Sequence, residues 1–421
     1  MKAKKFLCDR VFILTALIVV LSSLQNYAQF DDLLNHVKDK AKEKTEEKID
    51  KTIDDATSKK GDDNNQDKNS KRSNNTDNNI NSNNNDKNVT VNASSDTPSL
   101  KLYQNYDFVP GDTILFADDF TDDQEGEFPS HWSILNGQGM VNKSGDKMVF
   151  NLLEGNYAKV KPRMKTVNYL GNAFTIEFDL FAWNGADCGY GANVFFTDAE
   201  NSDNDKDILL LRYKSARADY FARELQGVEV KQSDDDFWNH WHHIAIAYKK
   251  PQMKVYLDQT RVLVLPDIGF NPEELAFGGL AGDESCPISF TNVRIASGGN
   301  MNMIGKKFTE AKIVTHGITF DIDKFDIKPE SMGTLNMIVG VLKSNPDLKF
   351  EIDGHTDNTG NASHNLTLSK QRADAVKKQL VSMGIDDSRL TTKGFGDTKP
   401  MSTNDTPDGR ANNRRVEFIR L

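Results

Sequence analysis

The chain has 421 residues, with 52 Lys and Arg against 62 Asp and Glu, and a formal net charge of −10 at pH 7. This length allows two or three domains. The acidic balance argues against binding to nucleic acid or to an anionic membrane through bulk charge.

The first 28 residues have the parts of a secretory signal peptide. A basic start is followed by an apolar run over residues 11–24 and by Ala28, a small residue suited to cleavage. The run is short for a membrane span. Cys8 precedes the run, whereas the cysteine of a lipoprotein follows it. We therefore expect an exported protein without a lipid anchor, with a net charge of −13 once residues 1–28 are removed.

Two segments separate this start from the first folded region. Residues 29–57 are rich in Lys, Glu and Asp, with apolar residues at helical intervals, which predicts a solvated, partly amphipathic helix. A short coiled coil is the alternative, but its apolar seam is interrupted between Ala41 and Ile49. Residues 58–99 are mostly Asn, Asp, Lys and Ser. They predict a disordered linker, because they cannot bury enough apolar surface to fold.

Residues 100–299 are predicted to form an all-β sandwich. Short apolar and aromatic runs recur between polar turns, and no long helical period is present. The predicted strands are 113–116, 148–153, 174–181, 194–196, 208–213, 243–248, 253–257, 261–265 and 290–295.

Four segments of this region resemble the concanavalin A-like (laminin G-like) jelly roll: residues 116–120, 174–178, 241–245 and 255–258. The resemblance implies a jelly-roll β-sandwich over residues 100–299. Because many unrelated functions share this fold, it says little about what the region does.

One strand of this region carries half of a catalytic pattern. Laminarinase-like jelly rolls use Glu-x-Asp-x-x-Glu, which places nucleophile and acid on one strand face. Glu177 and Asp179 match its start, but Ala182 occupies the position of the second glutamate. The acid–base pair would be incomplete, so we expect no enzyme. The strand should instead alternate, with Glu177 and Asp179 outward and Ile176, Phe178 and Leu180 inward.

The same region holds residue types that bind metals, but we expect no metal site. His242 and His243 point to opposite faces of a strand, so they do not converge with His240. Calcium is conceivable at an acidic loop that contains Asp203, Asp205 and Asp207. Ile208 replaces the glycine of an EF-hand loop, which favours a solvated loop.

Cys188 and Cys286 are the only cysteines beyond residue 28, and both lie in the predicted sandwich. A disulfide between them is plausible in an exported protein. Trp183 and Trp238 would stack on sugar rings if exposed, but burial is the commoner state of a tryptophan in a sandwich.

Residues 306–421 alternate between strand and helix patterns. They predict an α/β (βαβαβ-type) domain with helices on one side of a mixed sheet. The predicted strands are 313–320, 348–352 and a last one through Val416 and Phe418. The first helix starts at Pro329 and stops at Asn345-Pro346. The second runs from about Ser363 to Gly384. Its expected buried face consists of Leu366, Ala373, Val376, Leu380 and Met383.

The turn before this second helix carries the candidate binding residues. Gly354 and Gly360 permit a sharp turn, which places Asp357 in the loop and Arg372 on the helix. A carboxylate that faces a guanidinium suits a zwitterionic ligand: Asp357 would accept an ammonium, and Arg372 would hold a carboxylate with its fork. The alternative is an ion pair between Asp357 and Arg372 themselves.

Two separated motifs in this region resemble the OmpA-like peptidoglycan-binding domain. The first is Gly-His-Thr-Asp-Asn-Thr-Gly at 354–360 with Asn365, Leu-Ser at 368–369 and Arg-Ala at 372–373. The second comprises Gly-Phe-Gly at 394–396, Pro400, Asn404 and the run 409–417.

The resemblance covers about the last quarter of the chain and implies a ligand. By it, Asp357 and Arg372 hold the diaminopimelate of the cross-linking peptide. Asn365 and the loop residues Thr356, Asn358 and Thr359 would help to seat its carboxylates. For Arg414 and Arg415, a ligand role and pairing with acidic neighbours stay equally open.

Together these expectations describe a non-catalytic cell-envelope protein without a cofactor, located in the periplasm or at the outer membrane of a diderm bacterium. Its C-terminal domain would bind peptidoglycan and anchor the sandwich, a binding or structural module, to the wall. A carbohydrate or an envelope protein is a possible partner of the jelly roll. The alternative is a wall-anchored carbohydrate-active enzyme or sugar-binding adhesin, and Ala182 argues against the enzyme.

Overall fold

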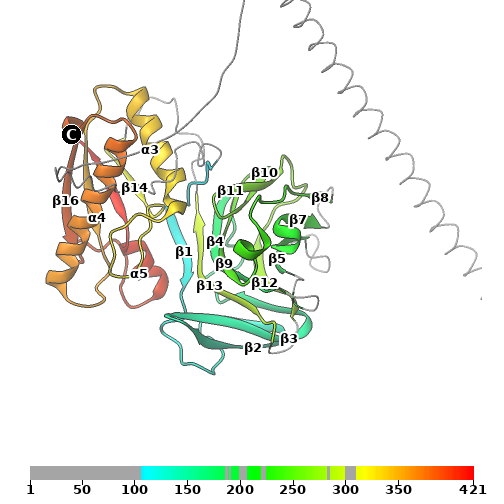
Figure 1. Ribbon diagram of the computed structural model, residues 1–421. Coiled ribbons are helices and arrows are strands. Elements are labelled where there is room, and N and C mark those ends of the chain that lie inside the picture. Colours follow the sequence, from blue (N-terminus) through cyan, green and yellow to red (C-terminus); the bar gives the residue numbers. More distant parts are fainter. Residues whose placement is uncertain are drawn as a thin grey trace, which may run out of the picture. The chain divides into compact units, whose positions relative to one another are not determined.

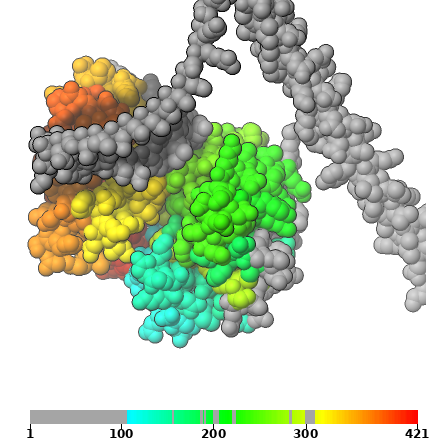
Figure 2. Space-filling model, viewed as in Figure 1, coloured from blue at the N-terminus to red at the C-terminus, as the bar shows by residue number. Residues whose placement is uncertain are grey.

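The part of the chain that the structure describes contains two β-sheets, one over residues 113–297 and one over 312–420 (Figure 1). This computed structural model describes residues 106–184, 188, 191–198, 206–219, 224–281, 285–298 and 310–421. The predicted signal peptide, the charged helix at 29–57, the linker at 58–99 and the acidic pair Asp203 and Asp205 lie outside these residues. Figure 2 gives the space-filling view, with the first sheet's residues in cyan to yellow-green and the second's in yellow to red.

The first sheet has 13 strands, and all of its pairings are antiparallel. The order is β11-β10-β9-β4-β13-β3-β12-β5-β6-β7-β8, with β1 paired to β13 and β2 to β3. The strands are β1 (Thr113–Asp118), β2 (Trp132–Ser144), β3 (Lys147–Pro162), β4 (Ala173–Ala182), β5 (Ala192–Thr197), β6 (Lys206–Leu210), β7 (Ala216–Asp219), β8 (Leu225–Gln226), β9 (His240–Lys249), β10 (Gln252–Leu257), β11 (Thr260–Leu265), β12 (Glu274–Ala281) and β13 (Ile288–Ser297). Two short helical turns accompany them, η1 (Arg212–Lys214) and α2 (Asp234–Phe237).

The prediction of an all-β middle region is confirmed at this coarse level, while the jelly roll stays a prediction. Each of the predicted strands overlaps an observed one. Strands β2, β7, β8 and β12 were missed. β2 is mostly exposed, so it lacks an apolar period. β12 contains Gly278, where a Cβ would lie 1.8 Å from the Ala158 carbonyl oxygen of β3, so close strand contact replaces side-chain packing there.

The core of this sheet is built around the fully buried Trp132. Its ring lies within 5.4–5.8 Å of the rings of Phe116, Phe150, Phe277 and Phe290. Its indole N–H donates to Asp118 Oδ2 at 2.9 Å, so the polar atom of the buried ring is satisfied.

The second sheet is mixed, as predicted, with the order β14-β17-β15-β16 and a parallel pairing only between β15 and β16. Its strands are β14 (Lys312–Thr315), β15 (Phe350–His355), β16 (Leu390–Gly396) and β17 (Val416–Arg420). The helices are α3 (Met332–Ser344), α4 (Ala362–Ser382) and α5 (Pro407–Asn413), with the turns η2 (Pro329–Ser331) and η3 (Asp387–Arg389). Among the described residues, no helix combines the length and apolarity needed to cross a membrane.

Three details of the predicted βαβαβ pattern need correction. The first strand ends at Thr315 rather than at 320, and Phe320 makes only an isolated bridge to Ile327. A third helix, α5, was missed because it spans only seven residues, and the fourth strand, β16, was missed as well. Leu366 is 48% exposed on the first turn of α4, whereas the rest of the predicted face is buried.

Packing of α4 on the sheet explains two glycines. A Cβ on Gly354 would lie 2.2 Å from the Ser369 carbonyl oxygen, and one on Gly394 would lie 2.4 Å from the Lys370 nitrogen. Gly354 therefore serves close helix–strand contact rather than the turn that we expected. Gly360, with φ of +86°, is the residue that the turn requires.

Candidate ligand-binding site

The loop between β15 and α4 holds Asp357, as predicted, and its backbone is anchored on both sides. The Thr356 N–H donates to the Gly396 carbonyl at 3.0 Å, and the Asn358 N–H donates to Asn404 Oδ1 at 3.3 Å. The Asn365 amide donates to the Thr359 carbonyl at 3.0 Å. Asn365 is buried, so the observed role of this predicted ligand residue is to shape the loop.

Asp357 is ionised and held in one orientation. Its Oδ2 accepts from Arg414 Nη1 at 2.7 Å, and its Oδ1 accepts from the Thr359 N–H at 2.9 Å. Burial opposes the charged form, but these two hydrogen bonds outweigh it, so the pKa of Asp357 is lowered. A carboxylate offers about four lone-pair sites, and these two bonds leave room for a further donor.

Arg372 lies on α4 with its charge uncompensated by a direct partner. Its Nε donates to the Lys324 carbonyl at 2.9 Å and its Nη2 to the Asp321 carbonyl at 3.1 Å, while the guanidinium lies 4.9 Å from the centre of the Phe320 ring. Within the described chain, these partners are neutral. Burial and the nearby charge of Arg414 lower the pKa of Arg372. An anion would relieve this repulsion.

The ion pairs contradict the alternative of an Asp357–Arg372 pair and show both Arg414 and Arg415 paired with acidic neighbours. Asp357 pairs with Arg414 and not with Arg372. Arg415 is buried and binds Glu417, with 2.7 Å between Nε and Oε1, so its role is structural. Arg414 keeps 44% of its side chain exposed. The loop therefore presents one carboxylate between two partly accessible guanidinium groups.

Residues 319–414, which include this loop and both arginines, match the family model described as "OmpA family". They form an OmpA-family domain. This part of the chain is 41% identical over 103 residues to "Probable lipoprotein YiaD" of Escherichia coli (strain K12), covering 24% of this chain and 47% of that protein. It is 42% identical over 107 residues to "Peptidoglycan-binding protein ArfA" of Mycobacterium tuberculosis (strain ATCC 25618 / H37Rv), covering 25% and 33%.

A solved structure, the peptidoglycan-associated lipoprotein from Burkholderia pseudomallei, is 27% identical with a TM-score of 0.24 and covers 27% of this chain and 91% of that chain. This chain spans less than half of the length of the two curated relatives.

The OmpA-family domain adds a second loop to the site, which sequence analysis missed. Residues 321–326 supply the carbonyls that hold Arg372, and Asp323 Oδ1 lies 3.1 Å from His364 Nε2 on α4. The side chains of Ile322 and Phe325 are 85% and 45% exposed. We expected a strand over residues 313–320 and therefore did not predict a loop after it. The apolar residues Ile322 and Phe325, which stand among aspartates, were the signal in the sequence.

The two carboxylates of the catalytic half-pattern lie on β4 of the 13-stranded sheet. We expected them to be exposed, and the structure shows them buried. Glu177 and Asp179 do alternate with inward residues, yet they are only 3% and 7% exposed. Arg294 Nε donates to Glu177 Oε2 at 2.9 Å. His243 Nδ1 donates to Asp179 Oδ1 at 3.0 Å, and its Nε2 lies 3.6 Å from Glu177 Oε1. Asn292 donates to Asp179 Oδ2 at 2.7 Å.

In this second group each carboxylate has a cationic partner, and Lys147 Nζ adds a third positive charge 3.8 Å from Asp179 Oδ2. Burial works against a charged His243, but the bonds to Asp179 and Glu177 outweigh it and raise the pKa of His243 to about 10. Burial likewise opposes ionisation of Glu177, and Arg294 with His243 overcomes it, so the pKa of Glu177 is lowered. Neither carboxylate is available as a general acid near neutral pH.

The remaining candidates of the middle region are mainly structural. His242 is buried, with Nδ1 2.9 Å from Asp258 Oδ2 and Nε2 2.8 Å from the Phe237 carbonyl, while His240 is exposed. Asp207 is buried and accepts from Asn193. Its pKa is raised to about 6 by burial. Among the described contacts, the three histidines do not meet at one site.

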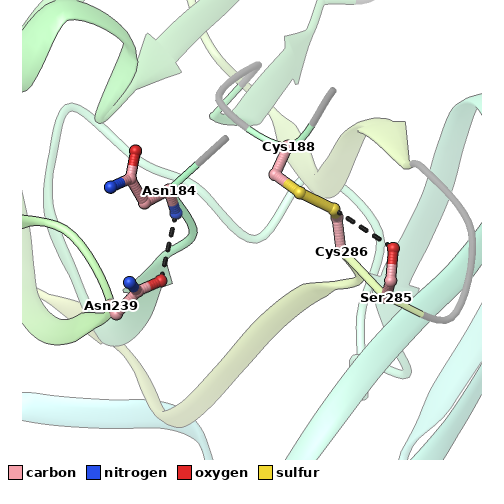
Figure 3. The surroundings of a disulfide bond; sticks show 5 residues. All are labelled: Asn184, Cys188, Asn239, Ser285 and Cys286. Carbon is pink, nitrogen blue, oxygen red and sulfur yellow. Dashed lines mark hydrogen bonds between the residues drawn. A yellow bond between two sulfur atoms is a disulfide. The ribbon is translucent and has the colours of Figure 1, made fainter. Parts of the chain in front are cut away.

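The predicted disulfide is present. Cys188 is joined to Cys286, 98 residues away, and the Asn184 N–H nearby donates to Asn239 Oδ1 at 3.2 Å (Figure 3). Trp183 and Trp238 are partly buried and line one pocket with both cysteines.

One group of described residues could hold a metal ion, namely Asp118, Asp123 and His131, whose ligand atoms lie within 4.8 Å of one another. Asp118 already accepts from the Phe120 N–H and the Trp132 indole, and Asp123 accepts from the Ser130 N–H at 2.9 Å. These hydrogen bonds help to close the loop between β1 and β2, while Asp123 Oδ2 and His131 Nδ1 are buried without a hydrogen-bond partner in the described part of the chain.

Proposed function

We propose that this chain is a non-catalytic cell-envelope protein that binds peptidoglycan through its OmpA-family domain and anchors the middle β-region to the wall. Asp357 would accept the ammonium of the diaminopimelate in the stem peptide, and Arg372 would hold the adjacent carboxylate. The observation that carries the proposal is the guanidinium of Arg372, which is fixed by two carbonyls but has no carboxylate partner within the described chain.

The arrangement suits a zwitterion better than a simple anion. Arg414 and the Thr359 amide keep Asp357 ionised and oriented, and lone pairs remain on its oxygens for an ammonium. The two arginines provide a positive field for a carboxylate beside it. The name of one relative, a peptidoglycan-binding protein at 42% identity, supports the same ligand.

The absence of catalysis is part of the proposal. In the described part of the middle sheet, Glu177 and Asp179 are neutralised by Arg294 and His243, and Ala182 is buried where a second glutamate would be needed. We also propose that the protein is exported to the periplasm or to the outer membrane. The middle region would bind a carbohydrate or a protein partner there.

Co-sedimentation of residues 29–421 with purified diaminopimelate-type sacculi tests this function. Wild type should bind, and Arg372→Ala should lose roughly 2–5 kcal/mol, which is about 30-fold or more in affinity. Arg163→Ala is the matched control, since Arg163 also donates to a backbone carbonyl but lies outside the site. Lysine-type sacculi, which lack the second carboxylate, should bind more weakly. Equal sedimentation of wild type and Arg372→Ala would overturn the assignment.

A further inference from the structure

Helix α5 of the OmpA-family domain lies beside β1 of the 13-stranded sheet (Figure 1). Asn412 Oδ1 accepts from the Ile114 N–H at 3.1 Å, and Asn412 Nδ2 donates to the Ile114 carbonyl at 3.0 Å. This is the pair of bonds that a neighbouring strand would make at an open sheet edge. Ala411 packs there with Ile114, Ala117 and Ala296. One side chain therefore docks α5 on the middle sheet.

Two ion pairs flank this contact. Lys165 Nζ lies 2.9 Å from Asp408 Oδ2, and Arg410 pairs with Asp122 in the loop between β1 and β2. Asp122 keeps 43% of its side chain exposed, so its pair contributes geometry more than stability.

A buried histidine completes the contact. His316 Nε2 donates to the Asn412 carbonyl at 3.1 Å, and the His316 carbonyl accepts from Nη1 of Arg294, a β13 residue, at 2.9 Å. Both His316 and Asn412 are buried. Breaking such a set leaves buried polar groups unsatisfied, which makes the docking costly to disrupt.

Helix α5 also contacts the residues that hold the ligand loop. Arg410 Nη1 donates to the Asn404 carbonyl at 3.3 Å. Asn404 Oδ1 accepts from Asn413 Nδ2 at 2.9 Å and from the Asn358 N–H at 3.3 Å. Arg414, the residue after the helix, binds Asp357 at 2.7 Å. Arg410 and Asn413 lie on α5 and Arg414 follows it, so α5 supports the loop directly through Arg414 and indirectly through Asn404.

We propose that the middle sheet positions the peptidoglycan-binding loop through α5, with Asn412 and Asp122 as positioning residues. The inference rests on the proposed function. The recognition site then depends on more than the OmpA-family domain. Helix α5 supports the loop that contains Asp357 and Asn358, and α5 is itself held by β1. Binding groups must be held within about 0.5 Å of the productive geometry to act together, so loosening α5 should weaken binding without touching a ligand contact.

The test uses residues 29–421 with three variants and a soluble diaminopimelate-containing muropeptide. Affinity is measured by calorimetry, and amide hydrogen exchange at Asn358 is measured without ligand. Asn412→Ala and Asp122→Asn should each weaken binding by about 2- to 30-fold and speed exchange at Asn358. Lys161→Ala is the control, because it removes an ion pair with Glu274 within the middle sheet and no contact with α5. It should leave both measurements unchanged.

The outcomes separate the two proposals. If wild type does not bind the muropeptide, the proposed function fails, while faster Asn358 exchange in Asn412→Ala still supports positioning by α5. Unchanged exchange and unchanged affinity in Asn412→Ala overturn the inference. If Asn412→Ala does not fold, Asp122→Asn decides, since its exposed side chain removes little stability. Equal weakening by Lys161→Ala would show an effect that does not pass through α5 and would also overturn it.

Discussion

Two charged clusters of this protein use similar residues for different ends. In the OmpA-family domain, the buried Asp357 pairs with Arg414, which is 44% exposed, while the hydrogen-bond partners of Arg372 are neutral carbonyls. On the middle sheet, Glu177 and Asp179 are enclosed with Arg294 and His243, which are 17% and 16% exposed. The first cluster contains a guanidinium, that of Arg372, without a carboxylate partner in the described chain, whereas both carboxylates of the second are paired with cations of the protein. Compensation and access, rather than residue type, separate a binding site from a structural network.

The physical origin of the closed network is the surface that covers it. The strand face that carries Glu177 and Asp179 continues through Ala245, Ala247 and Tyr256, which share an apolar cluster with the core of the OmpA-family domain. A carboxylate on such a covered face must be paired, because an isolated buried charge costs many kcal/mol. Asp357 is also buried, at 8% exposure, and its paired charge is supplied by Arg414, whose side chain remains 44% exposed.

The largest expected effect comes from opening the closed cluster. Glu177→Ala leaves the buried Arg294 without its carboxylate and should lower the free energy of unfolding by about 3–5 kcal/mol, measured by urea denaturation. Lys393→Ala is the comparison, because it removes the exposed partner of Glu351 and should leave unfolding unchanged. A Glu177→Ala protein as stable as wild type would mean that water enters the network and that the contrast between the clusters is false.

In the cluster around Asp357, a substitution should reduce ligand binding more than it reduces stability. Asp357→Asn keeps the shape of the side chain but removes its charge, so muropeptide affinity should fall by roughly 2–5 kcal/mol. Its ion pair with Arg414 is partly exposed, so the free energy of unfolding should change by only about 1 kcal/mol. Calorimetric titration and urea denaturation on the same preparation check both numbers. A large stability loss with intact binding would reassign Asp357 to the structural class.

A pH titration distinguishes buried histidines of the two kinds. Burial lowers the pKa of His316 to about 4, below its ordinary value near 6.5. The unfolded chain then binds the extra proton first, so stability present above pH 6.5 should be lost as the pH falls toward 4, by up to about 3 kcal/mol. His243 has its pKa raised to about 10, so its contribution is complete below pH 6.5 and is lost only as the pH rises through 10.

Urea denaturation midpoints between pH 4 and 7 measure how steeply the free energy of unfolding depends on pH. His316→Gln should flatten this dependence only in part, because His355 also has its pKa lowered to about 4, with burial as the main cause. An unchanged slope in His316→Gln would show that His316 does not carry the acid sensitivity.

The smallest effect is expected at the start of α4. Asn361 caps this helix by accepting the N–H groups of Ser363 and His364 at 2.9 and 3.2 Å. Asn361→Ala should cost about 1 kcal/mol in the free energy of unfolding, while Asn361→Ser retains a cap. Because the cap lies between Asp357 and Arg372 along the chain, binding by the two variants shows how far the open cluster depends on helix placement. Equal stability of both variants would argue against capping at this position.

The sequence alone determined the parts of this protein that depend on near neighbours. Alternation at Phe350 and Ile352, the glycine at 360 and the helical spacing that leads to Arg372 were enough to place the site on a strand, a loop and a helix. The two OmpA-like motifs identified the domain. Period and turn chemistry act over a few residues, and they can therefore be read without the fold.

Only the tertiary structure decided which charges compensate one another. Arg414 reaches Asp357 across 57 residues, Arg294 reaches Glu177 across 117, and Asn412 reaches Ile114 across 298. The burial of Glu177 and Asp179 likewise depends on a surface supplied from elsewhere in the chain. No local pattern specifies such partners, because they are selected by the packing of whole sheets and helices against one another.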